Sequence, residues 1–97
     1  MSAVTLAVLA ALSPAQAVER TVVLSVENAT CALCAPIVRM SLERVVGVLS
    51  VEVVEDYAMW PPVAATIVYD DAATSVDDLI AATTNAGYPS YPASAAD

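Results

Sequence analysis

Two cysteines separated by two residues offer the clearest chemistry in this sequence. Cys31 and Cys34 lie in the stretch NATCALCAPIV, residues 28–38, and they are the only cysteines in a chain that contains no histidine. Pro36 indicates the first turn of a helix, because proline fits only at a helix start. Cys31 is therefore predicted in a loop and Cys34 at the helix N-terminus. Unpaired backbone N–H groups and the helix dipole favour a thiolate there.

Two thiolates that converge on one point suit a soft metal ion. Tetrahedral zinc needs four ligands, and the chain has no histidine and no further cysteine to supply them. Hard cations prefer oxygen ligands. The remaining candidates are ions that are content with two sulfur ligands, namely Hg(II), Cu(I) or Ag(I).

Two other uses of the cysteine pair remain open. The Cys-x-x-Cys spacing also occurs in thiol–disulfide redox proteins, although Thr30 stands where the thioredoxin fold usually has an aromatic residue. The other alternative is a purely structural disulfide, but it would close a very small loop and remove little entropy from the unfolded chain. Metal binding is the favoured interpretation.

The composition excludes several other functions. The chain has 97 residues, enough for one small domain, and a formal charge of −8 from three arginines, no lysine and eleven acidic residues. Nucleic acids and anionic membrane surfaces are therefore poor partners, because they attract clustered basic residues. Without histidine there is no Ser-His-Asp triad. The two glycines stand forty positions apart, which excludes a glycine-rich phosphate loop.

The first 17 residues, MSAVTLAVLAALSPAQA, are predicted to be a secretory signal peptide. Residues 3–12 form an apolar run that is too short to cross a bilayer as a helix. Ala15-Gln16-Ala17 then gives the small-x-small pattern of a cleavage site. No lysine or arginine precedes the apolar run, which is unusual for a leader. We therefore expect export to an oxidising compartment.

The remaining residues alternate between strand and helix patterns. Strands are expected at residues 21–26, 48–55 and 63–69, with a short edge strand at 88–92 whose prolines cannot donate ladder hydrogen bonds. Helices are expected at 34–46 and from 76 to the glycine at 87. Their buried stripes are Val38, Leu42 and Val45 in the first helix, and Val76, Leu79, Ile80 and Thr83 in the second.

This order of elements predicts an α+β fold of the ferredoxin-like βαββαβ type. Right-handed crossovers would give a four-stranded antiparallel sheet with two helices on one face. The domain is expected at residues 18–92, followed by a flexible tail at 93–97. The loop at 56–62 separates the second and third strands and contains two prolines.

Four further side chains could bear on the cysteine site. Met59 and Trp60 could cap Cu(I), but partial packing at a hairpin tip is the favoured interpretation. Met40 is expected to pack. Tyr88 could either shield the thiolates or pack in the core.

Several segments together resemble a known family. These are TVVLSV followed by TCALC, the helix ending VVGV, and the second half VYDDAATSVDDLIAATTNAGYPS. With the leader, they resemble the periplasmic mercuric ion-binding proteins of bacterial mercury resistance, within the heavy-metal-associated domain family. Asn28 and Ala29 stand where that family commonly has Gly-Met, and Ala35 intervenes before Pro36. The loop at 56–62 is also longer than the usual hairpin.

The resemblance implies a non-enzymatic carrier. Such a protein would capture Hg(II) through Cys31 and Cys34 and pass it by thiol exchange to an inner-membrane mercury transporter. A copper(I) chaperone of the same fold and a small thiol–disulfide redox protein are the alternatives. A monomer without stable membrane insertion is expected.

Export makes the first testable prediction. The mature chain should begin at Val18, because Ala15 and Ala17 are small and follow the apolar run. N-terminal sequencing of the protein recovered from the periplasm measures this directly. A protein that still begins at Met1 would contradict the predicted signal peptide.

Overall fold

The two central strands form because apolar side chains alternate along them. In this computed structural model, which describes residues 18–93, β1 (Glu19–Val26) pairs antiparallel with β3 (Val63–Asp70). Side chains of one strand face opposite sides with a period of two, so one side of each strand is buried. The buried residues are Val22, Leu24 and Val26 of β1 and Val63, Ala65, Ile67 and Tyr69 of β3.

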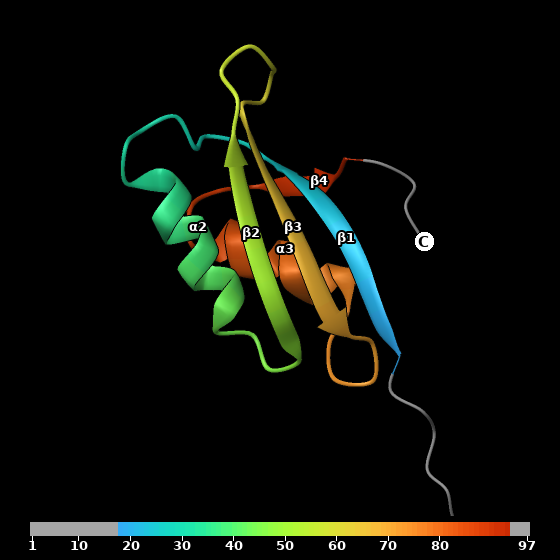
Figure 1. The fold of residues 1–97 in the computed structure, drawn as a ribbon. Coiled ribbons are helices and arrows are strands. Elements are labelled where there is room, and N and C mark those ends of the chain that lie inside the picture. The colour runs from blue at the N-terminus through green and yellow to red at the C-terminus, as the bar shows by residue number, and fades with distance from the viewer. Residues whose placement is uncertain (1–17, 94–97) are drawn as a thin grey trace, which may run out of the picture.

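Two further strands complete an open sheet in the order β2-β3-β1-β4 (Figure 1). β2 (Val48–Glu55) pairs with β3, and a register shift between Val48 and Ser50 marks an irregularity at its start. β4 (Ser90–Pro92) is a short edge strand beside β1. Its brevity follows from Pro89, which precedes it, and Pro92, its last residue, because proline lacks a backbone N–H to donate.

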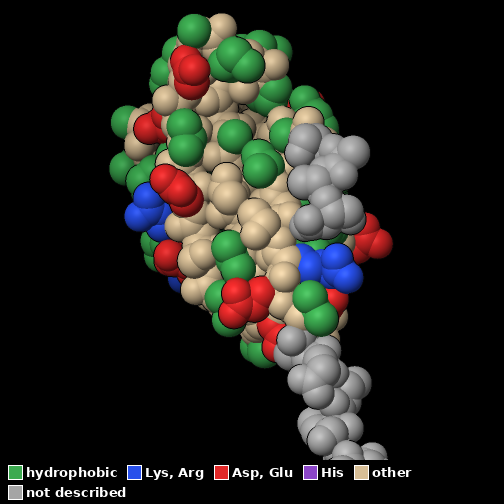
Figure 2. Space-filling model, turned by 45° about the vertical axis from the view of Figure 1, so that its right-hand side comes forward, with side chains coloured by type: hydrophobic (Ala, Val, Ile, Leu, Met, Phe, Trp, Pro, Cys, Tyr) green, Lys and Arg blue, Asp and Glu red, His purple; other side chains and the backbone are tan. Residues whose placement is uncertain are grey.

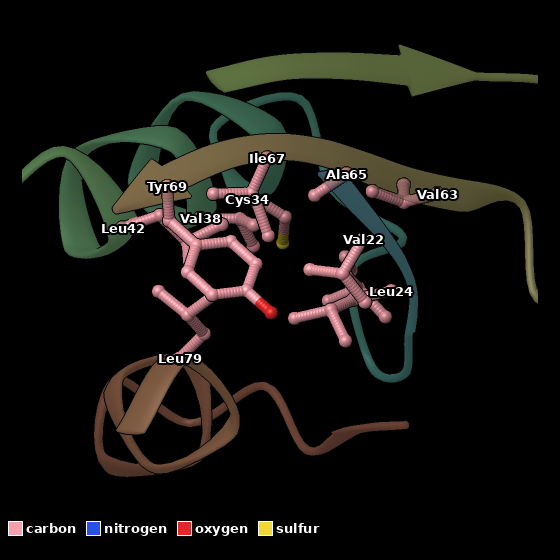
Figure 3. Packing of buried hydrophobic residues seen from close by; sticks show 12 residues of the cluster. Val22, Leu24, Cys34, Val38, Leu42, Val63, Ala65, Ile67, Tyr69 and Leu79 are labelled. Atoms are coloured by element: carbon pink, nitrogen blue, oxygen red, sulfur yellow. The ribbon is translucent and has the colours of Figure 1, made fainter. Parts of the chain in front are cut away.

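Both helices contribute to one core on a single face of the sheet. α2 (Cys34–Glu43) and α3 (Val76–Asn85) bury Val38, Leu42 and Leu79 against the inward residues of β1 and β3 (Figure 3). Ser75 is the N-cap of α3, and its Oγ accepts a hydrogen bond of 3.2 Å from the backbone N–H of Asp78. The predicted ferredoxin-like fold is confirmed, and so is the antiparallel sheet.

The first helix is shorter than its sequence pattern predicts. α2 ends at Glu43 rather than at residue 46, and the chain then turns through Gly47 into β2. The carbonyl of Gly47 accepts a hydrogen bond of 2.8 Å from the N–H of Asp70, so this turn is tied to the end of β3. A continued helix could not reach that position. Val45 still packs against the core, as its spacing predicts.

The first strand begins earlier than predicted, at Glu19, because Asp71 holds its start. Arg20 Nε donates to Asp71 Oδ2 at 2.7 Å, and the backbone N–H of Val18 donates to Asp71 Oδ1 at 3.2 Å. The hydrogen bond from Arg20, followed by that from Val18, lowers the pKa of Asp71 below its usual value. At the other end of the chain, the N–H of Ala93 donates to the Val23 carbonyl at 2.8 Å.

The predicted signal peptide and residues 94–97 of the predicted tail lie outside the described residues. Within residues 18–93, no helix is long and apolar enough to cross a membrane.

The two glycines give a matched test of the α2–β2 turn. Both have positive φ angles, +101° at Gly47 and +102° at Gly87. A Cβ at Gly47 would lie 2.7 Å from the Ala73 Cβ, whereas a Cβ at Gly87 would meet nothing within 4 Å. Gly87→Ala should lower the free energy of unfolding by about 1 kcal/mol through backbone strain alone. Gly47→Ala should lower it by about 2 to 4 kcal/mol, because overpacking is added.

Urea unfolding of the two variants and the wild type measures this difference. Equal losses in both variants would contradict the close approach of the α2–β2 turn to Ala73.

Candidate metal centre

The loop between β1 and α2 carries the cysteine pair at one end of the sheet. Its first residue is anchored, because the N–H of Glu27 donates to the Pro89 carbonyl at 2.8 Å. Asn28 then adopts a positive φ of 66°, a conformation that asparagine tolerates better than most residues. Ala29, which stands at a position where the resembling family commonly has methionine, is buried and belongs to the core. The loop is therefore attached to the sheet on both sides of its turn.

The two cysteine side chains are joined to each other, although one is exposed and the other is buried. Cys31 and Cys34 form a disulfide, with their Cα atoms 5.1 Å apart. Cys31 is exposed in the loop, whereas Cys34 is only 4% exposed. Figure 3 shows Cys34 among the core side chains, near Val38 and Ile67. The predicted placement, loop for one cysteine and helix start for the other, is confirmed.

Backbone groups of the loop are arranged around the Cys34 sulfur. The N–H of Cys31 donates to Cys34 Sγ at 3.2 Å, and the N–H of Cys34 donates to the Cys31 carbonyl at 3.1 Å. The first turn of α2 contains no acidic residue. Nothing in that turn therefore opposes the positive end of the helix dipole, which stabilises a thiolate once the disulfide is reduced.

The neighbourhood of the pair supplies no further ligand set. Among residues 18–93, no group of three or more histidine, cysteine, aspartate or glutamate side chains is placed to hold a metal ion. A metal held in this part of the chain would therefore depend on the two sulfurs. That donor set suits a soft ion of low coordination number.

The other side chains that the sequence analysis considered for this site lie in different surroundings. Tyr88 is partly buried and packs against the core cluster, in agreement with one of its two predicted roles. Met40 is half exposed, so the prediction that it packs is wrong. Met59 and Trp60 do lie at the tip of the β2–β3 hairpin, but they are 62% and 84% exposed. The partial packing expected there is minimal, because the tip extends beyond the sheet (Figure 1).

One neighbour of the site was not anticipated from the sequence. The hairpin residues Trp60, Pro61 and Pro62 line a hollow of about 210 Å³ together with Glu27, Asn28 and Thr30 of the cysteine loop. This proximity could have been inferred from the predicted topology, because β1 ends at the same end of the sheet as the β2–β3 hairpin. The pairing of Val26 with Val63 places both segments there.

A tyrosine forms a hydrogen bond at the base of the same hairpin. Tyr57 donates from its hydroxyl to Glu55 Oε2 at 3.3 Å. Partial desolvation, together with the charge and hydrogen bond of Glu55, raises the pKa of Tyr57 above its usual value. A tyrosine is protonated at neutral pH in any case, and the upward shift extends this donor role to higher pH.

The fold and the site together define a ferredoxin-like domain with a Cys-x-x-Cys pair on the loop before its first helix. No protein-family model matches the chain. The mercuric transport protein periplasmic component of Pseudomonas aeruginosa is 40% identical over 85 residues, which cover 88% of each chain. The chain belongs to the family of these periplasmic components of mercuric transport.

Solved structures agree with this assignment. The crystal structure of oxidized MerP from Ralstonia metallidurans CH34 matches with a TM-score of 0.70 and 38% identity, over 79% of this chain and all of that one. The mercury-bound form of MerP from the bacterial mercury detoxification system matches with a TM-score of 0.64 and 37% identity, over 77% of this chain and 97% of that one.

The different burial of the two sulfurs predicts different reactivity. In the reduced protein, Cys31 should react with iodoacetamide several times faster than Cys34, because Cys34 is enclosed by the core. Mass spectrometry of peptides after timed labelling measures both rates. The urea-unfolded protein serves as the control, in which the two rates should converge. Faster labelling of Cys34 in the folded protein would contradict the assignment.

Proposed function

We propose that this protein is a periplasmic carrier that binds one Hg(II) ion through Cys31 and Cys34 and delivers it to an inner-membrane mercury transporter. The observation that carries the proposal is the position of the two sulfurs. They lie within bonding distance of each other, one exposed and one buried, with no competing ligand set in the described part of the chain. The mercury-bound relative supports Hg(II) as the cargo.

Binding requires the reduced form of the pair. The disulfide must take up two electrons and two protons from a thiol reductant, which is itself oxidised to a disulfide. Hg(II) then displaces both protons and forms two Hg–S bonds. Cys34 supplies a sulfur held in place by the core, and Cys31 supplies one that solvent and partner molecules can reach.

Delivery follows from the low coordination number. An incoming thiolate of the acceptor forms a third Hg–S bond, after which the bond to Cys31 breaks and that thiolate takes a proton from solvent. A second acceptor thiolate releases Cys34 in the same way. Because the metal stays open to attack, tight binding does not prevent rapid transfer. The exchange makes and breaks equal numbers of Hg–S bonds, and the proposed role is therefore that of a carrier and not of an enzyme.

The structure also supports export with cleavage after Ala17. Val18, the residue that would become the mature N-terminus, already donates its N–H to Asp71 Oδ1 and accepts a hydrogen bond of 3.1 Å from the N–H of Asp71. Cleavage would turn this donor into a charged ammonium beside a carboxylate. The new terminus would thus be held at the edge of the sheet.

Cu(I) is the alternative cargo, because it also accepts two thiolates. Native mass spectrometry of the reduced protein, with Hg(II) and Cu(I) in competition, separates the two. The proposal expects a single bound mercury. Retention of copper in preference to mercury would reassign the protein as a copper carrier.

Single cysteine variants test the site itself. Cys31→Ser and Cys34→Ser should each weaken Hg(II) retention against glutathione by at least about 100-fold, since even outer-shell partners of a metal contribute about 10- to 100-fold. Equilibrium dialysis with glutathione as competitor measures the retention. Ser41→Ala, on α2 but outside the pair, is a control that should retain mercury. Wild-type retention by both cysteine variants would refute the carrier function.

A further inference from the structure

The β2–β3 hairpin, residues 56–62, is an ordered projection and not a loose connection. Its ends are joined by a hydrogen bond of 2.7 Å from the Asp56 N–H to the Pro62 carbonyl. Within the turn, the N–H groups of Ala58 and Met59 donate to the Asp56 side chain and carbonyl, each at 3.0 Å. The tip therefore presents its side chains in a defined arrangement.

This projection carries large side chains that are exposed and do not belong to the core. Tyr57, Met59 and Trp60 are all more than 60% exposed, and Trp60, at 84%, is the only tryptophan in the sequence. Figure 2 shows hydrophobic side chains gathered at this end of the molecule. Exposed tryptophans contribute little to the stability of a domain, but they are enriched among the residues that dominate binding energy at interfaces.

The projection stands directly beside the cysteine loop. Trp60 and Thr30 line the same hollow of about 210 Å³, and Thr30 precedes the exposed Cys31. A side chain that filled this hollow would lie against Thr30, the residue that precedes Cys31 in the loop. On the other side of Cys31, Leu33 is 69% exposed, so apolar surface flanks the loop on both sides.

The charge around the hollow is negative. Glu27 lines it, and Glu55 and Asp56 lie at the base of the hairpin, whereas no arginine contributes to its lining. Arg39 of α2 lines a different groove, together with Glu55. A partner with a basic side chain beside an apolar one would therefore match this surface in both charge and polarity.

We propose that the hairpin tip is the docking element for the acceptor protein, with Trp60 as its anchor. The occupant is an acceptor segment that carries a cysteine, an apolar side chain for the hollow beside Trp60, and a lysine or arginine for Glu27. This inference rests on the proposed carrier function. Docking holds the acceptor thiolate near Cys31 and converts a collision between thiols into an exchange within a complex.

The test compares metal transfer to a docking peptide with transfer to a small thiol. The probe is a peptide in which two cysteines lie between a leucine and two arginines, and glutathione is the small thiol. Trp60→Ala should slow Hg(II) transfer to the peptide by about tenfold, equivalent to about 1.4 kcal/mol. Transfer to glutathione and retention of Hg(II) should not change. Glu27→Gln should slow transfer to the peptide as well, and a peptide with glutamates in place of arginines should be a poor acceptor for the wild type.

Val46→Ala is the matched control. Val46 is 82% exposed but lies in the turn before β2, at the opposite end of the sheet from the hairpin. Its loss should not affect either transfer rate. The fluorescence of Trp60 gives an independent readout, since its emission should shift when a metal-free peptide with serines in place of cysteines binds.

The outcomes separate this inference from the carrier function. Failure of the wild type to bind Hg(II) would refute the carrier function itself. Normal binding with equal transfer to the peptide by wild type and Trp60→Ala would refute only the docking role. An emission shift with uncharged lipid vesicles but not with peptide would overturn the proposal in favour of a membrane contact. Dimerisation that Trp60→Ala abolishes would overturn it in favour of a second copy of this chain.

Discussion

The packing of the first turn of α2 against the sheet is the constraint on which the site depends. Cys34 lies in that turn and is buried with Val38 and Leu42 of the same helix face. Its sulfur cannot move without disturbing the core, so one of the two sulfurs is effectively part of the scaffold. Cys31 is joined to it by only two residues, and its exposure follows from the loop that precedes the helix. The chain thereby combines a held sulfur with an accessible one, which is what stepwise exchange requires.

The antiparallel topology places the cysteine loop and the β2–β3 hairpin at one end of the molecule. β1 ends, the β2–β3 hairpin turns, and the segment before β4 passes at the same edge, where Pro89 accepts a hydrogen bond from Glu27. The opposite end contains the tight turn at Gly47 and the contacts of Asp71 with Arg20 and Val18. The contacts at this opposite end join the start of β1 and the α2–β2 turn to the end of β3. The first end carries the cysteines and the exposed apolar side chains.

Burial and charge have separate effects at the end of the sheet that carries the cysteines. The core fixes Cys34, and its sulfur accepts a hydrogen bond from the backbone N–H of Cys31 at the positive end of α2, with no basic side chain involved. Acidic groups at Glu27 and in the hairpin set the polarity of the surroundings. A site of this kind favours the thiolate form of the cysteines through the helix, and the surface around it is acidic.

The sequence by itself determined the cysteine pair, the order of the elements and the ferredoxin-like fold, because these depend on local signals. The strand patterns and Pro36, in the first turn of a helix, act over a few positions of the chain. The end of α2 at Glu43 was decided by tertiary structure, since the hydrogen bond between Gly47 and Asp70 draws the chain into β2. The exposure of Trp60 and its position beside Thr30 were also decided there, because thirty residues separate the two and only the pairing of β1 with β3 brings them together.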